Sequence, residues 1–300
     1  MEVSIALKIT ALTKSYGSTQ ALRGVDLDVR RGEIFGFLGP NGAGKTTTIR
    51  CVLDLIHRNG GTVSVLGMDP QENPVAVRAR CGYLPGELRL DDAFTVEGQL
   101  RYLNRLRHNH ADWNYARELA RRIDLDLKTP IKNLSKGNKQ KVGVVQAFMH
   151  RPELLILDEP TAGLDPLVQR EVLRIIGEAR KAGATVFFSS HNISEVQEVA
   201  DRVGIIRNGV VVEVAEPSTL INRSLRTARV RFRRPVDSQA LLATPGVKLL
   251  AQEDGASLLL QVEGEMDGLI KTLAGFPVLD FETERPTLEE VFLTYYGSNQ

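Results

Sequence analysis

A glycine-rich stretch in the first fifth of the chain has the residue types and the spacing that bind phosphate. The run Gly39-Pro-Asn-Gly-Ala-Gly-Lys-Thr46 fits the pattern G-x-x-x-x-G-K-[ST] at every fixed position. Its glycines let backbone N–H groups turn toward phosphate oxygens. Lys45 offers a positive charge between the β- and γ-phosphates, and the Thr46 hydroxyl is a ligand for Mg²⁺. This loop predicts nucleotide binding, but it does not separate a kinase from a GTPase or a transport ATPase.

Two adjacent carboxylates follow an apolar run later in the chain. Leu154-Leu-Ile-Leu157 leads directly into Asp158 and Glu159. In proteins with a phosphate loop, an Asp at the end of such a strand helps to hold Mg²⁺, and Asp158 suits that role. Glu159 is placed to orient and deprotonate an attacking water. Together with the loop, this pair predicts hydrolysis of a nucleoside triphosphate bound with Mg²⁺.

Short apolar strands must bring these groups to one edge of a sheet. Ile34–Leu38, Leu154–Leu157 and Thr185–Ser189 are each apolar enough for burial inside a parallel sheet. Helical periodicity follows the first strand over Thr46–Leu55 and lies between the other two over Val168–Lys181. This alternation predicts a mostly parallel α/β core.

The composition excludes several classes of protein. Lys and Arg (38) nearly balance Asp and Glu (37), for a net charge of +1, so a nucleic-acid-binding surface is not indicated. No segment approaches the about 20 consecutive apolar residues of a membrane-spanning helix. Cys51 and Cys81 have no metal-ligand spacing and are expected to be reduced core thiols. The composition therefore predicts a soluble, cytoplasmic chain.

Four further motifs stand in a fixed order around the phosphate loop and the carboxylate pair. Tyr16 precedes the loop, Leu134-Ser-Lys-Gly-Asn138 precedes a predicted helix, Ala162-Gly-Leu-Asp165 follows the carboxylates, and His191 follows Ser189-Ser190. In this order the motifs resemble those of the ABC ATPase family, over roughly Val3–Pro217. The resemblance implies a P-loop NTPase fold, in which an antiparallel β subdomain and a helical subdomain flank the α/β core.

The resemblance also implies a role for individual residues. Tyr16 would stack on adenine, and His191 would act with Lys45 and Glu159 in catalysis by touching the γ-phosphate. Thr46 and Asp158 would hold the metal. Besides Tyr16, the implied ATP contacts are Gly39, Pro40, Asn41, Gly42, Ala43, Gly44, Lys45, Thr46 and Thr47.

Members of the family work as head-to-tail pairs that hold two ATP molecules between them. Ser135, Gly137 and Asn138 would contact the γ-phosphate of the ATP on the partner subunit, as a hydroxyl and free N–H groups at the start of a helix allow. Asp165 would lie in the loop that contacts the partner. The implied assembly is a homodimer or a paired ABC subunit, with ATP and Mg²⁺ as cofactors.

Two departures from the family pattern stand out. The signature usually reads Ser-Gly-Gly-Gln, whereas this chain has Ser135-Lys-Gly-Asn138 and so adds bulk and charge at Lys136. A glutamine normally follows the segment Gly82-Tyr-Leu-Pro85, and Gly86-Glu87 stands there instead. Either Glu87 takes over the metal contact by a one-residue shift, or that contact is absent.

The character of the sequence changes near residue 222. We predict an ABC nucleotide-binding domain over residues 1–222 and a small α+β accessory or regulatory domain over 223–300, which includes a last helix at Thr287–Tyr296. The alternating arginines of Arg226–Arg234 invite a membrane-surface interpretation, but a solvated edge strand is favoured. The run Arg285–Phe292 resembles the end of ABC-2-type and drug-export ATPases.

The sequence therefore predicts the ATP-hydrolysing subunit of a membrane transporter, and the resemblance implies an exporter. It would bind a separate integral-membrane permease on the inner face of the plasma membrane and would bind no nucleic acid. Three alternatives stay open: a soluble ABC ATPase coupled to a non-transport partner, a P-loop kinase, and a nucleotide sensor without turnover. The transported substrate does not follow from the sequence.

Overall fold

The computed structural model describes residues 4–108, 111–223 and 226–284. Contacts within the chain group it into two compact units, Met1–Val214 and Ala215–Gln300, and each is described by itself. The predicted division near residue 222 stays a prediction. No helix within the described ranges is long and apolar enough to cross a bilayer.

The first unit is built on a six-stranded sheet with the order β5-β6-β7-β3-β8-β9. The pairs β5–β6, β6–β7, β7–β3 and β3–β8 are all parallel, as the alternation of strands and helices predicts. Its strands are β3 (Ile34–Leu38), β5 (Cys81–Leu84), β6 (Leu154–Asp158), β7 (Thr185–Ser190), β8 (Arg202–Arg207) and β9 (Val210–Ala215).

Three central strands of this sheet are buried on both faces, as their unbroken apolar runs predict. Every residue of β3, β6 and β7 is buried. Phe37 and Phe187 pack with ring centroids 5.3 Å apart on one face. On the other face, the hydrogen of Gly36 leaves room for Val196, since a Cβ there would lie 2.5 Å from its Cγ1. These strands hold the loops at their carboxyl ends at a fixed separation.

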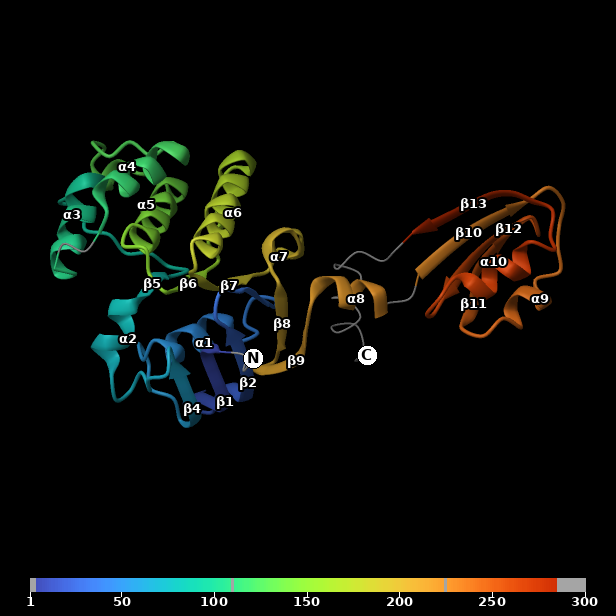
Figure 1. Ribbon diagram of the computed structural model, residues 1–300, viewed down its shortest axis with the longest axis horizontal. Coiled ribbons are helices and arrows are strands. Elements are labelled where there is room, and N and C mark those ends of the chain that lie inside the picture. The colour runs from blue at the N-terminus through green and yellow to red at the C-terminus, as the bar shows by residue number, and fades with distance from the viewer. Residues whose placement is uncertain (1–3, 109–110, 224–225, 285–300) are drawn as a thin grey trace. The chain divides into compact units, whose positions relative to one another are not determined.

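A three-stranded antiparallel sheet and one helix cover the first face. The sheet has the order β2-β1-β4, and its strands are β1 (Ile5–Tyr16), β2 (Thr19–Arg30) and β4 (Gly60–Val65). Helix α1 (Lys45–Val52) contacts β2, β4 and β6, so it lies between the two sheets (Figure 1). This antiparallel layer is the β subdomain that the family resemblance implies.

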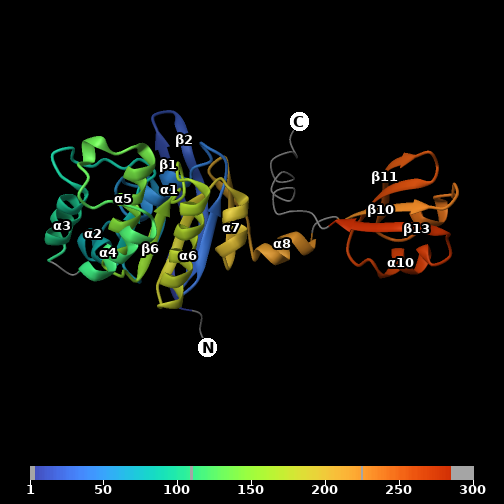
Figure 2. The same ribbon diagram turned by 90° about the horizontal axis from the view of Figure 1, so that it is seen from above.

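Helices cover the opposite face and form a cluster of their own beyond β5 and β6 (Figures 1 and 2). Helix α5 packs on β5 and β6, and α7 packs on β3 and β7. The helices on this side are α3 (Val96–Leu106), α4 (Trp113–Arg122), a 3₁₀ turn (Ile131–Asn133), α5 (Lys136–Phe148), α6 (Pro166–Lys181) and α7 (Ile193–Val199). Helix α2 (Pro74–Arg80) instead contributes Val77 to the core of the first face. The cluster α3–α5 is the expected helical subdomain, so the predicted fold class is confirmed.

Side-chain caps fix where the helices near the site begin. Ser135 accepts a hydrogen bond from the backbone N–H of Asn138 at the start of α5. Asp165 accepts from Leu167 and Val168 at the start of α6. Each cap satisfies N–H groups that would otherwise lack a partner in the first turn.

The second unit is a four-stranded antiparallel sheet with the order β11-β12-β10-β13 and two helices packed on one face. Its elements are α8 (Pro217–Arg223), β10 (Arg226–Phe232), α9 (Gln239–Leu242), β11 (Val247–Glu253), β12 (Ser257–Val262), α10 (Asp267–Leu273) and β13 (Val278–Glu284). It is the small α+β fold that the sequence predicts. The predicted helix Thr287–Tyr296 lies outside the described residues.

The arginine-rich strand does not lie at an edge, so that part of the prediction was wrong. β10 pairs with both β12 and β13. Arg231 forms an ion pair with Asp280 at 2.6 Å, and Arg229 lies opposite Glu282 in the ladder. The alternation places Ala228 and Val230 in the core and the arginines on the other face. A carboxylate on the neighbouring strand β13 pairs with Arg231, and Glu282 lies opposite Arg229. The sequence alone does not reveal this pairing of strands.

Candidate functional site

The predicted phosphate loop connects the end of β3 to the start of α1. Gly42 and Gly44 have φ values of 80° and 113°, a region that side chains disfavour. Gly39 passes so close to β8 that a Cβ would lie 2.7 Å from the Ile206 carbonyl oxygen. No side chain caps α1, so N–H groups at its start stay available to an anion.

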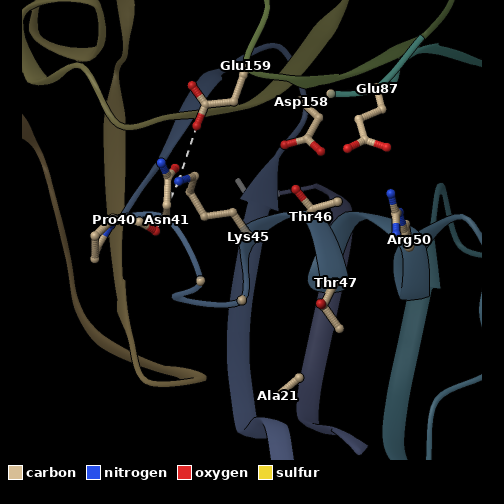
Figure 3. A pocket seen from close by; sticks show the side chains of 13 residues that line it. Ala21, Pro40, Asn41, Lys45, Thr46, Thr47, Arg50, Glu87, Asp158 and Glu159 are labelled. Atoms are coloured by element: carbon tan, nitrogen blue, oxygen red, sulfur yellow. Dashed lines mark hydrogen bonds and ion pairs between the residues drawn. The ribbon is translucent and has the colours of Figure 1, made fainter. Parts of the chain in front are cut away.

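A pocket of about 320 Å³ opens over this loop (Figure 3). Of the predicted ATP contacts, Gly39, Ala43 and Tyr16 do not line it. Tyr16 is half-exposed near the end of β1, and the Lys14 ammonium lies 5.3 Å from its ring centroid. The lining residues include Pro40, Asn41, Gly42, Gly44, Lys45, Thr46, Thr47, Arg50, Glu87, Asp158 and Glu159.

Lys45 is nearly buried at the centre of this arrangement, with 6% of its surface exposed. Its ammonium donates to the carbonyl oxygens of Gly39 at 2.6 Å and Pro40 at 3.3 Å. It also forms an ion pair with Glu159 Oε1 at 3.2 Å, the dashed contact in Figure 3. The loop therefore presents one positive charge at a fixed point.

Asp158 and Glu159 form the second side of the pocket. They begin the carboxylate turn, residues 158–165, which starts at the last residue of β6. Asp158 is completely buried, and its Oδ1 accepts from the Ser189 hydroxyl at 2.6 Å. Its Oδ2 has no hydrogen-bond partner among the described residues. Figure 3 shows Asp158 and Glu87 facing the Thr46 hydroxyl from the opposite side of the pocket. An unpaired buried carboxylate oxygen is unfavourable unless a cation satisfies it.

Glu159 adopts a backbone conformation that non-glycine residues seldom take, with φ of 53°. Its N–H donates to both the carbonyl and the hydroxyl oxygen of Ser189, at 3.2 and 3.1 Å. Its second carboxylate oxygen lies 2.7 Å from His191 Nδ1. The strained backbone aims the carboxylate at Lys45 and His191, so three residues from separate parts of the chain meet at one point.

A buried carboxylate that the sequence analysis missed ties the turn to the loop that carries His191. Glu195 accepts from the hydroxyls of Thr161 at 2.7 Å and Ser190 at 2.9 Å. It also accepts from the Asn192 side-chain amide at 3.2 Å. Asn192 caps α7, and Glu195 follows three residues later. This spacing resembles a capping box, so the sequence could have predicted a role for Glu195 at the start of α7.

The signature residues lie elsewhere. None of Ser135, Gly137 and Asn138 lines the pocket over the phosphate loop. Gly137 instead approaches the carboxylate turn from α5, where a Cβ would lie 2.7 Å from the Gly163 carbonyl oxygen. Asp165 caps α6 and its side chain points to no group of the pocket. Within one chain, the signature and the phosphate loop are separate surfaces.

Two family models match the chain, one on each unit. The first, described as ABC transporter, matches residues 22–162. The second, described as ATP-binding protein DrrA1-3-like, C-terminal domain, matches residues 217–296.

Two of three similar proteins cover nearly the whole chain, and the third covers 70% of it. An uncharacterized ABC transporter ATP-binding protein, YhaQ of Bacillus subtilis, is 33% identical over 97% of this chain and 99% of its own length. The daunorubicin/doxorubicin resistance ATP-binding protein DrrA of Streptomyces peucetius is 32% identical, over 97% and 92%. The bacitracin transport ATP-binding protein BcrA of Bacillus licheniformis is 37% identical over 70% of each chain.

Solved structures agree on the fold. An ATP-binding subunit of an ABC transporter superimposes with a TM-score of 0.66 and 31% identity, over 72% of this chain and 91% of its own. The bacterial ABC transporter cassette MJ0796, solved as a dimer, has a TM-score of 0.61 at 21% identity, over 70% and 98%. With its phosphate loop, its buried carboxylates and relatives of full length, the chain belongs to the ABC transporter ATP-binding proteins and is an ATPase of that family.

Proposed function

We propose that this chain is the motor subunit of an exporter and that it hydrolyses MgATP in a site shared between two copies. The observation that carries the proposal is the convergence of Lys45, Glu159 and His191 over the phosphate loop. Lys45 would contact the β- and γ-phosphates, while free backbone N–H groups of the loop and of the start of α1 would surround them. Tyr16 would stack on adenine outside the pocket.

Glu159 is the proposed general base. Its carboxylate lies at the edge of the pocket, where the water that attacks the γ-phosphate would bind. It would accept a proton from that water, and His191 at 2.7 Å would hold it in the orientation that this transfer needs. When ATP binds, the γ-phosphate would replace the Glu159 carboxylate as the partner of Lys45, which frees the base to face the water.

The residues beside the phosphate loop fit a magnesium ion. Asp158 Oδ2 is buried and has no hydrogen-bond partner among the described residues. Glu87 lies on the same side of the pocket, and the Thr46 hydroxyl faces both carboxylates (Figure 3). Among the described residues no cluster of three or more His, Cys, Asp or Glu side chains could hold a metal, which is compatible with Mg²⁺ because this ion is usually bound by one or two carboxylates and by substrate phosphates. Bound Mg²⁺ would neutralise charge on the phosphate oxygens. Thr46 and Asp158 would hold it, and Glu87 would add a third oxygen.

The position of the signature supports a shared site. Ser135, Gly137 and Asn138 are exposed or half-buried at the start of α5, outside the pocket of their own chain. A second copy in head-to-tail orientation would bring them onto the γ-phosphate, with Asp165 in the contact between the copies. The MJ0796 cassette, which shares the fold, was solved as a dimer.

A groove between α2, α3 and α5 has the chemistry of a docking surface for the permease. Exposed Leu55, Val75 and Leu106 line it. Arg78 and Arg107 stand among them, and neither has a carboxylate partner among the described residues. The Arg107 guanidinium donates to the carbonyl oxygens of Ala79 at 3.2 Å and Cys81 at 3.1 Å, which hold it in place, and its charge would attract an acidic partner. The assembly would lie on the cytoplasmic face of the plasma membrane, with residues 223–300 as an accessory domain.

Turnover of MgATP by the purified chain, alone and with its membrane partner, tests the proposal. Glu159→Gln keeps the size of the side chain but removes the base, so we expect ATP to bind with unchanged affinity and turnover to fall by about 100-fold or more. An unchanged turnover number for this variant would remove Glu159 from the proposed role. Because two relatives are named for bacitracin and daunorubicin, these drugs are the first compounds to screen for stimulation of ATP turnover.

A further inference from the structure

Gln140 is a buried amide on α5 that no step of the proposed reaction uses. Only 8% of its surface is exposed. Its side-chain nitrogen donates to two successive backbone carbonyls, those of Glu159 at 3.0 Å and Pro160 at 3.3 Å. These carbonyls lie at the start of the carboxylate turn, so the amide contacts the backbone of the proposed base itself.

The backbone at this point needs external support. Glu159 is held at φ of 53°, a conformation that costs a non-glycine residue about 1–3 kcal/mol and persists only where its surroundings enforce it. Ser189 holds the N–H side of the residue. On the carbonyl side, the Glu159 oxygen accepts from the Ala162 N–H at 3.2 Å within the turn, and the Gln140 amide adds the bond from outside the turn. Because Pro160 has no N–H, this peptide cannot donate a bond that would hold the turn in another way.

The same helix carries the signature sequence. Gln140 lies five residues after Ser135, and Gly137 approaches the Gly163 carbonyl within the distance that only a glycine allows. Two contacts therefore join the first turns of α5 to the carboxylate turn, one at each end. A displacement of α5 would be transmitted to Glu159 through the Gln140 amide.

We propose that Gln140 is a positioning residue, which fixes the carboxylate of Glu159 by holding its backbone and so links the base to the signature helix of its own chain. This inference rests on the proposed role of Glu159. A shift of about 1 Å at a reacting group can lower the rate by about 100-fold. Loss of the amide donor should therefore reduce kcat and leave ATP binding unchanged.

Two substitutions separate positioning from simple filling of space. Gln140→Met keeps the length of the side chain without a donor, and Gln140→Glu keeps its shape but turns the donor into an acceptor that faces two carbonyls. We expect kcat to fall by about 10- to 100-fold in the Met variant and at least as far in the Glu variant. The Kd for ATP should stay within about threefold of the parent in both variants, because Gln140 does not line the pocket over the phosphate loop. A Gln140→Glu variant with nearly the parent kcat would overturn the proposal, since a space-filling role tolerates the closest isostere.

Lys141 offers a matched control on the same helix. It is 8% exposed and its ammonium donates to a backbone carbonyl, that of Asp124, 3.1 Å away and outside the carboxylate turn. Lys141→Met should lower the melting temperature as Gln140→Met does but keep kcat within about threefold of the parent, since its bond does not reach the base. Equal losses of kcat in the two variants would mean that α5 packing, not the amide, is responsible.

The double variant Gln140→Met, Glu159→Gln completes the test. If Gln140 acts through Glu159, the double variant turns over no more slowly than Glu159→Gln alone. A further loss would overturn the inference. A Glu159→Gln variant that keeps the parent rate would instead overturn the proposed base, and an inactive Glu159→Gln beside a fully active Gln140→Met would overturn only the role of Gln140.

Discussion

The phosphate loop and the carboxylate turn face each other across one pocket, and both follow strands that are buried on both faces, but they are built by different means. The loop takes its shape from its own backbone, through Gly42 and Gly44 at positive φ. The turn takes its shape from side chains of other elements, with Ser189 of β7 and Gln140 of α5 at its start. Recognition of phosphate is therefore local in sequence, while placement of the carboxylates depends on the assembled fold.

This difference predicts that substitutions in the two regions change different kinetic quantities. A change in the loop should act on ATP affinity, because the loop is proposed to supply the phosphate contacts. A change around the turn should act on kcat at nearly constant affinity, because its side chains position Asp158 and Glu159.

The largest expected effect follows removal of the one charge in the loop. Lys45→Ala takes away an ammonium whose hydrogen bonds to phosphate are each worth about 1.5–3 kcal/mol. We expect ATP affinity to fall by about 100-fold, since each 1.4 kcal/mol is a factor of about ten. A fluorescent nucleotide titration measures it. A Kd within threefold of the parent would mean that the backbone alone binds the phosphates.

A change behind the turn should spare affinity and reduce the rate. Ser189→Ala removes the donor to Asp158 Oδ1 and one acceptor of the Glu159 N–H. Because a bond to a charged group contributes about 1.5–3 kcal/mol, kcat should fall by about tenfold or more. Steady-state assays over a range of Mg²⁺ concentrations are the measurement. A rise in the Kd for ATP without a change in kcat would contradict the proposal that the residues around the turn determine the rate and not the affinity.

A smaller loss of rate is expected at the buried carboxylate of α7. Glu195→Gln keeps the shape of the side chain but places an amide donor where an acceptor serves Thr161, Ser190 and Asn192. One of these bonds is lost, which predicts a decrease in kcat of about three- to tenfold. The same assay measures this decrease. Glu195→Asp keeps the carboxylate and shortens the side chain, so it tests the effect of side-chain length by itself. A parent-like kcat in the Gln variant would limit Glu195 to a structural role.

The smallest effect should come from a side chain of the loop itself. Asn41→Ala leaves every backbone N–H of the loop in place, and the Asn41 side chain is exposed. We expect the Kd for ATP to change by at most about threefold, within the range of surface substitutions. Isothermal calorimetry can resolve such a change. A tenfold loss would show that this amide contributes as much as the backbone does.

The sequence was sufficient for the fold and for the local half of the site. The apolar runs of β3, β6 and β7 predict strands and not helices, because each run is too short for a helix and lies next to a turn. The phosphate loop lies wholly within eight residues. Its position at the end of β3 needs no knowledge of the rest of the chain.

The other half could not be predicted, since it depends on the register between distant strands. Asp158 lies opposite Ser189 only because β6 and β7 pair as they do, 31 residues apart. Gln140 reaches Glu159 only because α5 packs on β6. The arginines of β10 were misplaced at an edge for the same reason, because the sequence does not say that β13 pairs beside them.

The measurement that tests the account most directly is complementation between two inactive variants. Lys45→Ala spoils the phosphate loop, and Ser135→Arg spoils the signature that is proposed to contact the ATP of the other copy. In a head-to-tail pair of one copy of each, one site loses both parts and the other keeps both. The account predicts that mixing the two proteins restores ATP turnover, up to about half of the parent rate since one of two sites is intact. A mixture with only the summed residual rates of the two variants would contradict a shared site.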